Sequence, residues 1–216
     1  MNTEQLSQHP AEEPENTEEE SKYTLKEFGG DAMDILECVA AAVFVVILCF
    51  TFVICIARVD GTSMVPTLQD SDRLAVSRLS REYENGDILI INNWTGHPMG
   101  NDGTIYSTPG FGKRIVKRLI AQEGQTVNID FDAHIVYVDG VALDEPYIAE
   151  PTHEQCDNAL PYPLTVPEGY VFVLGDNRNG SSDSRSSYVG LVEEKDILGK
   201  VLIRILPLKK FGRIGA

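Results

Sequence analysis

Cysteine is scarce in this chain, and three of its four cysteines lie inside a single apolar run. Only Cys156 lies outside that run, so no disulfide framework is expected in the polar part of the chain. His153 and Cys156 have the spacing of half a metal site, but no second pair completes it. The sequence therefore predicts a surface loop with a spare thiol at this point, and no metal.

Basic residues are also few, since the 216 residues carry 18 Lys and Arg against 33 Asp and Glu. The formal net charge is −15. A nucleic-acid-binding protein normally presents a basic face to the phosphates, and this chain is acidic in both its N-terminal and its C-terminal parts. The one basic cluster, at 113–118, lies within an apolar alternation. Nucleic acid is therefore not expected as a partner.

No histidine lies in a recognisable catalytic motif. His9 is in a polar N-terminal segment, His97 and His153 are in polar loops, and His134 begins a predicted strand. A Ser-His-Asp triad therefore has no support in the sequence, and only the spatial arrangement could establish one.

The N-terminal part combines a polar segment with a long apolar run. Residues 1–31 are rich in Glu, Gln, Asn, Pro and Thr, which predicts a disordered acidic tail, either a spacer or a docking segment. Residues 38–57 contain 20 consecutive uncharged residues, enough for a helix of about 30 Å. The run is apolar on every side and follows acidic residues, so we interpret 32–58 as one permanent transmembrane helix with its flanks. Two basic residues lie on each side, which leaves the orientation open.

Beyond the apolar run the patterns favour β-strands. Strand-like segments lie at 86–94, 114–121, 134–143, 169–176 and 197–207, and the Asp-Gly pair inside the third predicts a hairpin turn. This part has no sustained helical period and no second membrane span. We therefore predict a mostly β domain over 59–216, carried on a single N-terminal membrane helix.

A serine in the segment VDGTSMVPTL, residues 59–68, is a candidate nucleophile. Ser63 follows the apolar run closely, and Gly61 and Pro66 on either side of it favour a turn. Most serines in such turns are solvated loop residues. A serine hydroxyl reacts well only when a base lies next to it.

Lysine is the alternative base. In RIVKRLIA, residues 114–121, strand alternation places Lys117 on one face with Ile115 and Leu119. Burial there would lower the pKa of the amine and allow it to accept a proton. The alternation is equally compatible with an amine that extends to solvent at a strand edge. Lys113 has the same strand parity, so alternation does not exclude it as the base.

Four segments in order resemble the conserved boxes of bacterial type I signal peptidases, over about residues 37–216. They are VDGTSMVPTL, GDILI, KRLIAQEGQTV and GDNRNGSSDSR, and they follow one predicted membrane helix. The resemblance, closest to the Gram-positive members, implies that Ser63 is the nucleophile and Lys117 the general base. The spacing to Gly124 favours Lys117 over Lys113 in that register.

The resemblance also implies supporting roles for other residues. Ser181 is expected to hydrogen-bond the lysine amine. Asp183 and Arg185 are expected to form a charged pair that braces the site, with Asp176 and Arg178 in the same loop. Next to the nucleophile, Met64 and Pro66 are expected to contact the substrate.

Three positions depart from the family pattern. Glu123-Gly124 stands where the family has Gly-Pro, and Ala121 stands where it has Gly. Some relatives have a serine two positions before the nucleophile that adds its hydroxyl to the oxyanion hole, and this chain has Gly61 there. The backbone N–H of Ser63 is therefore expected to carry more of that role.

The implied protein is a serine endopeptidase that removes signal peptides from exported preproteins at the membrane surface, without metal or cofactor. Its fold would be the β domain shared by signal peptidases and repressor peptidases. It would be a single-pass protein of the cell membrane, with the tail cytoplasmic and the peptidase domain outside. Its partners would be signal-peptide-bearing preproteins and the lipid bilayer, and its oligomeric state is not indicated.

Two other functions compete with this one. A non-catalytic membrane assembly factor of the same family would normally have lost the serine or the lysine, and both are present. A self-cleaving repressor peptidase would carry a DNA-binding helical domain where this chain has a polar tail and an apolar run.

Overall fold

The computed structural model describes residues 25–48, 51, 53–79, 82–157 and 160–214. It contains one α-helix, twelve β-strands and short 3-10 turns within these residues. The elements are α1 (Leu25–Leu48), β1 (Ile54–Arg58), β2 (Arg73–Ser77), β3 (Ile88–Gly96), β4 (Thr108–Ala121), β5 (Thr126–Asp130), β6 (Ile135–Val138), β7 (Val141–Ala142), β8 (Leu164–Thr165), β9 (Tyr170–Leu174), η2 (Arg178–Gly180), β10 (Val192–Glu193), η3 (Glu194–Asp196), β11 (Ile197–Leu206), η4 (Leu208–Lys210) and β12 (Gly212–Arg213).

The chain divides into two compact units, residues 1–45 and 46–216. The first unit contains most of α1, which exposes large apolar side chains such as Val43 and Phe44. Residues 1–24 of the predicted disordered tail lie outside the described residues, and 25–31 belong to the helix. Helical structure therefore begins earlier than the composition predicts.

The prediction of one helix through residue 57 is wrong for its last turns. Helix α1 ends at Leu48, and Ile54–Arg58 form strand β1, which pairs with β2 in antiparallel register. Hydropathy alone does not distinguish helix from strand in an apolar run. Here pairing with β2, whose Leu74 and Val76 are buried, decides the outcome. Among the described helices, none is both long and apolar enough to span a membrane.

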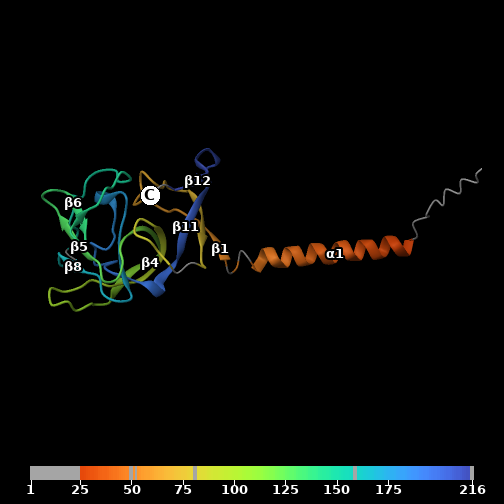
Figure 1. The fold of residues 1–216 in the computed structure, drawn as a ribbon, viewed down its shortest axis with the longest axis horizontal. Helices are drawn as coiled ribbons and strands as arrows, with labels where there is room; N and C mark the ends of the chain where they lie inside the picture. The colour runs from red at the N-terminus through yellow and green to blue at the C-terminus, as the bar shows by residue number, and fades with distance from the viewer. Residues whose placement is uncertain (1–24, 49–50, 52, 80–81, 158–159, 215–216) are drawn as a thin grey trace, which may run out of the picture. The chain divides into compact units, whose positions relative to one another are not determined.

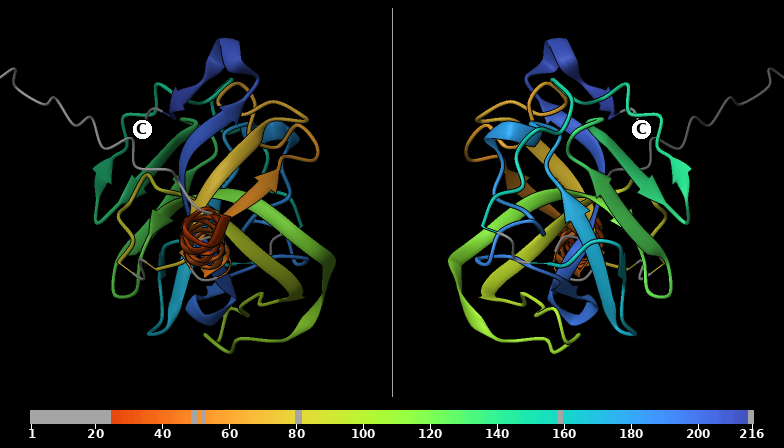
Figure 2. Two further views of the ribbon diagram at one scale, coloured as in Figure 1. Left: turned by 90° about the vertical axis from the view of Figure 1, so that its right-hand side faces the viewer. Right: turned by 90° about the vertical axis from the view of Figure 1, so that its left-hand side faces the viewer.

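The second unit consists of two antiparallel sheets. The larger sheet has the strand order β1-β2-β11-β3-β4-β9-β10, with β12 paired to β11, and the smaller has the order β7-β6-β5-β8. In Figure 1 the small sheet lies at one side of this unit, and β1, β11 and β12 lie at the other. Both views of Figure 2 show β3 and β4 as one long, strongly curved hairpin. The prediction of a mostly β domain is confirmed.

The predicted strands correspond to β3, β4, the β6–β7 hairpin, β9 and β11. The predicted hairpin turn is made by Asp139 and Gly140, whose φ angles are 53° and 79°. Positive φ at both central residues is the condition for the tight turn that matches strand twist, and Asp-Gly meets it at low cost.

Two apolar clusters hold the elements that carry the candidate site. One contains Val59, Met64 and Leu68, together with core residues of β2 and β3, and so anchors the segment around Ser63. The other contains Ile115 and Leu119, packed against residues of β3, β9 and β11. Segment 59–68, which carries Ser63, and strand β4, which carries Lys117, are therefore both fixed by buried side chains on either side of these two candidate residues.

Candidate active site

The segment that carries Ser63 is a tight turn after β1. The N–H of Leu68 donates to the carbonyl of Met64 at 2.8 Å, and the N–H of Gly61 donates to Asp70 Oδ1 at 2.9 Å. Gly61 has φ of +97°, a conformation that L side chains rarely adopt. A serine at this position would be strained, so the backbone conformation of the turn explains why residue 61 is glycine here and not the serine of some relatives.

The structure brings the predicted nucleophile and base together. Lys117 Nζ donates to Ser63 Oγ at 2.8 Å. Lys117 is only 3% exposed, so its amine does not extend to solvent along the strand edge. Lys113, in contrast, has a side chain that is 59% exposed and pairs with Asp60 at 3.5 Å. Of the two lysines with the same strand parity, only Lys117 contacts the serine.

Burial makes this amine a usable base near neutral pH. Desolvation is the largest effect and lowers the pKa of Lys117 to about 8. The nearby carboxylates of Asp183 and Asp176 oppose it, and the guanidinium of Arg185 adds to it. A base with a pKa close to the working pH is partly neutral and still a strong proton acceptor.

The expected hydrogen bond from Ser181 to the lysine amine is not formed. Ser181 is buried, and its Oγ has no hydrogen-bond partner within the described residues. It packs against Gly175, where an added Cβ would lie 2.1 Å from Ser181 Oγ and 2.5 Å from the carbonyl oxygen of Ser63. Gly175 is thus required for the close approach of the loop to Ser63, and nothing in the sequence alone distinguished it from other glycines.

The second expected contact, between Asp183 and Arg185, is present. Arg185 Nε donates to Asp183 Oδ1 at 2.8 Å, both side chains are fully buried, and Asp183 also accepts from the N–H of Gly175. Burial is the largest single effect and raises the pKa of Asp183, but the charge and hydrogen bonds of Arg185, the N–H of Gly175 and the amine of Lys117 together hold the pKa below its usual value. The pair therefore stays charged and braces the loop beside Lys117.

Asp176 pairs with a residue whose role the sequence did not indicate. Arg118 donates to both carboxylate oxygens of Asp176, at 2.8 and 2.7 Å, and to the carbonyl of Gly86 at 2.7 Å. Its guanidinium also stacks over the Tyr147 ring at 3.8 Å. Asp176 in addition accepts a hydrogen bond from Thr67, in segment 59–68. The two sequence neighbours Lys117 and Arg118 thus connect β4 with segment 59–68 and with the loop after β9.

Arg178 completes this buried network. Its guanidinium donates to Glu145 Oε2 at 2.9 Å and to Thr152 Oγ1 at 3.1 Å, and its carbonyl accepts from Arg185. An intact buried ion pair contributes little net stability, because the attraction is offset by the cost of removing both charges from water. Removal of one member is destabilising, because it leaves a buried charge without a partner. The signal in the sequence was the run of charged residues in GDNRNGSSDSR, whose partners lie far away in the chain.

A cavity of about 400 Å³ opens beside Ser63 and Lys117. Its walls come from residues 56–64, from 111 and 113–117 of β4, and from the loop at 180 and 182. Met64, which the resemblance implies contacts the substrate, lines the cavity, whereas Pro66 does not and instead makes a β-bridge with Ile148. The site therefore combines a serine hydroxyl, an amine that can lose its proton near neutral pH, and a partly apolar cavity next to them. These are the groups that acyl transfer by a serine requires.

Comparison with known proteins relates the chain to signal peptidases. The profile of the family described as signal peptidase, peptidase S26, matches residues 32–206. A probable signal peptidase I-1 of Synechocystis is 37% identical over 163 residues, which cover 73% of this chain and 74% of that protein. Signal peptidase IB of Staphylococcus aureus is 33% identical, with 80% of this chain and 88% of that protein covered. A crystal structure of a signal peptidase I from Enterococcus faecalis covers 55% of this chain and 96% of that chain, with 32% identity and a TM-score of 0.39.

Proposed function

We propose that this chain, which belongs to the signal peptidase family (peptidase S26), removes signal peptides from exported preproteins with Ser63 as nucleophile and Lys117 as general base. The observation that carries the proposal is the 2.8 Å contact between the buried Lys117 amine and the Ser63 hydroxyl. A serine without such a base would react too slowly to be useful.

The chemistry follows from this pair. In its neutral form Lys117 accepts the proton of Ser63 while Oγ attacks the carbonyl carbon of the scissile bond. The negative charge on the carbonyl oxygen is stabilised by the backbone N–H of Ser63. Lys117 then returns the proton to the leaving amine, which departs and leaves an acyl-enzyme. Water, deprotonated by Lys117, cleaves the ester and restores Ser63.

Two unpaired strand edges support binding of the substrate as an extended segment. Within the described residues, β1 is the terminal strand of its sheet, and β4 pairs with β9 only through its C-terminal residues 118–121. Both edges contribute to the cavity beside Ser63. An extended peptide placed there could pair its backbone with them, in the manner of β-strand addition. Small side chains before the scissile bond would fit the hollow lined by Met64 and Ile90.

A membrane anchor on the N-terminal side fits this substrate. The signal peptide of a preprotein is apolar, and an enzyme held in the same plane meets it at a raised effective concentration. The exposed apolar side chains of α1, including Val43 and Phe44, favour such an environment. We place the N-terminal tail in the cytoplasm and the β domain on the outer face of the cell membrane.

The direct test uses the full chain in detergent with one preprotein substrate. Ser63→Ala and Lys117→Ala should each abolish cleavage, because either change removes one half of the dyad. Lys113→Ala is the matched control, since it removes an exposed lysine on the same strand, and it should cleave at close to the wild-type rate. Normal cleavage by either dyad variant would refute the assignment. An unmodified chain that leaves the preprotein intact would favour the non-catalytic assembly factor.

A further inference from the structure

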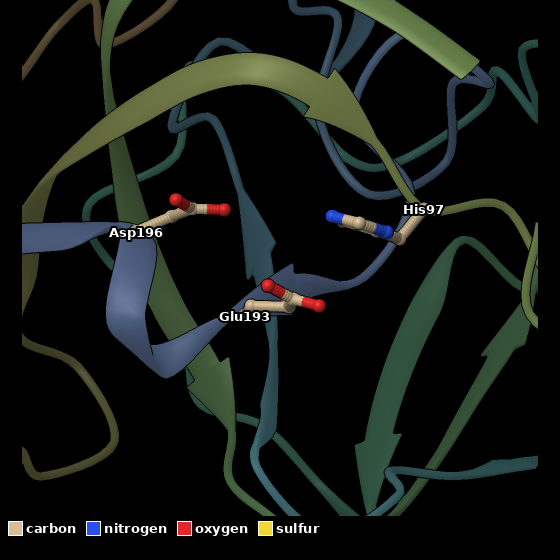
Figure 3. A group of neighbouring side chains, drawn as sticks. All are labelled: His97, Glu193 and Asp196. Carbon is tan, nitrogen blue, oxygen red and sulfur yellow. The ribbon is translucent and has the colours of Figure 1, made fainter. Parts of the chain in front are cut away.

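A second group of side chains with metal-binding atoms lies away from the proposed active site. It consists of His97, Glu193 and Asp196, and one ligand atom from each lies within 4.8 Å of the others (Figure 3). His97 directly follows β3, Glu193 ends β10, and Asp196 ends η3. None of the three lines the cavity beside Ser63.

The imidazole of His97 has an unsatisfied nitrogen that faces the two carboxylates. The residue is 7% exposed, and its Nε2 has no hydrogen-bond partner within the described residues. Figure 3 shows the ring nitrogen farthest from the backbone directed toward Asp196, with Glu193 beside the gap. Buried polar atoms normally have a partner, and a native structure that leaves one unpaired requires an explanation.

The surrounding contacts hold these groups in place. The backbone N–H of His97 donates to the carbonyl of Val189 at 2.8 Å, and its carbonyl accepts from the N–H of Leu191 at 2.9 Å, which fixes the backbone that carries the ring. The rings of Tyr170 and His97 pack edge-on, with their centroids 5.8 Å apart. The hydroxyl of Tyr170 donates to Glu193 Oε1 at 3.2 Å. Such supporting hydrogen bonds to ligand side chains are typical of metal sites.

The charge around the group favours a cation in the gap. Glu193 and Asp196 bring two carboxylates within 4.8 Å of the His97 imidazole. Lys195 pairs with Glu193, but through Oε2, and its side chain is 76% exposed. With this one exposed ammonium against two carboxylates, the group keeps a net negative charge.

We propose that His97, Glu193 and Asp196 bind a divalent transition-metal ion of the Zn²⁺ type. One imidazole nitrogen and two carboxylate oxygens are ligands that Zn²⁺ accepts at about 2.0–2.2 Å, with water in the fourth position. Ligands on a tetrahedral ion at that distance are roughly 3.4 Å apart. The present spread of up to 4.8 Å needs only a small closure of the two carboxylates around the ion.

The ion would be structural and not catalytic. η3 connects β10, at one end of the larger sheet, with β11 in its middle, next to β3. An ion held by the three residues would therefore tie together the end of β3, the edge strand β10 and the start of β11. Because it binds the folded chain and needs two distant parts of the chain in place, His97 and the segment 193–196, it should raise the thermal stability of the β domain.

The test requires a background free of a competing surface site. His134 and His153 lie on the surface with their Nδ1 atoms 3.1 Å apart, so they too could hold Zn²⁺. The full chain carrying His134→Gln, without a histidine tag, is titrated with Zn²⁺ by calorimetry, and its melting temperature is measured with and without Zn²⁺. We expect one ion per chain and a higher melting temperature with Zn²⁺.

Two further variants in the same background locate the ion. Asp196→Asn should lower the Zn²⁺ affinity by at least the roughly 10–100-fold that loss of a supporting partner costs, and should remove the thermal shift. Glu194→Gln is the matched control, because it removes an equal charge from an exposed neighbour in η3, and it should retain both. Absence of Zn²⁺ binding in the His134→Gln chain, or binding and a thermal shift that Asp196→Asn leaves unchanged, would overturn the proposal.

Discussion

Replacement of Lys117 by methionine should inactivate the protein and at the same time stabilise it at neutral pH. Methionine has nearly the length of lysine but no amine, so it can occupy the buried position without a desolvation cost. The variant gains stability because the buried site solvates the protonated amine less well than water does. The pKa of Lys117 is 10.5 in an ordinary setting and about 8 in the folded protein.

The size of the effect follows from this difference. A change of one in pKa corresponds to about 1.4 kcal/mol, so the buried ammonium costs about 3 kcal/mol below pH 8. The hydrogen bond to Ser63, worth about 1 kcal/mol, is lost in the variant. The expected net gain at pH 7 is about 2 kcal/mol, or roughly 4–8 °C in melting temperature for a chain of this size.

The gain should depend on pH in a defined direction. Between about pH 8 and 10.5 the unfolded lysine binds a proton that the folded one has released, so the stability of the unmodified protein rises with pH through this window. The advantage of the methionine variant should therefore shrink from pH 7 to pH 10.

Thermal unfolding in detergent, followed by circular dichroism at both pH values, measures this. Lys113→Met is the matched control and should change the melting temperature little at either pH, because that side chain is largely exposed. If Lys117→Met is no more stable than the unmodified chain at pH 7, or if its gain is unchanged at pH 10, the amine is not held at a desolvation cost and the reasoning fails.

Two further predictions concern the pH dependence of cleavage and the buried network. The rate of cleavage of a short peptide substrate at low concentration should fall about tenfold per pH unit well below pH 8 and level off above it, because only the neutral Lys117 amine accepts the proton; a flat profile from pH 6 to 9 would contradict this. Asp176→Asn should lower the free energy of unfolding by about 3–5 kcal/mol, measured by urea denaturation, since it leaves Arg118 buried without its carboxylate. Asp60→Asn, which breaks an exposed pair, should cost less than about 1 kcal/mol, and equal losses in the two variants would be inconsistent with the burial argument.

Local sequence patterns were sufficient to predict most of the longer strands of the β domain. Alternating segments bounded by turn residues became β3, β4, β9 and β11, and the Asp-Gly pair made the predicted hairpin turn. Short strands such as β8 and β10, of two residues each, were not predicted because they have too few residues to show a period. Strand β1 was taken for helix because its apolar composition is the same in both structures, and only its pairing with β2 distinguishes them.

The chain by itself determined the residue types of the proposed chemistry and their order: a serine in a glycine-proline turn, a lysine in an apolar strand, and a polar loop after a third strand. Together with the strand segment GDILI, these three segments were enough for a family resemblance, which the family profile confirms. Tertiary structure decided what alternation left open, namely that Lys117 and not Lys113 contacts Ser63, and that its amine is buried. It also decided the partners of the buried arginines, because Arg118 and Asp176 are 58 positions apart in the chain. Desolvation and ion pairing depend on what surrounds a group in space, and that information is absent from any local stretch of sequence.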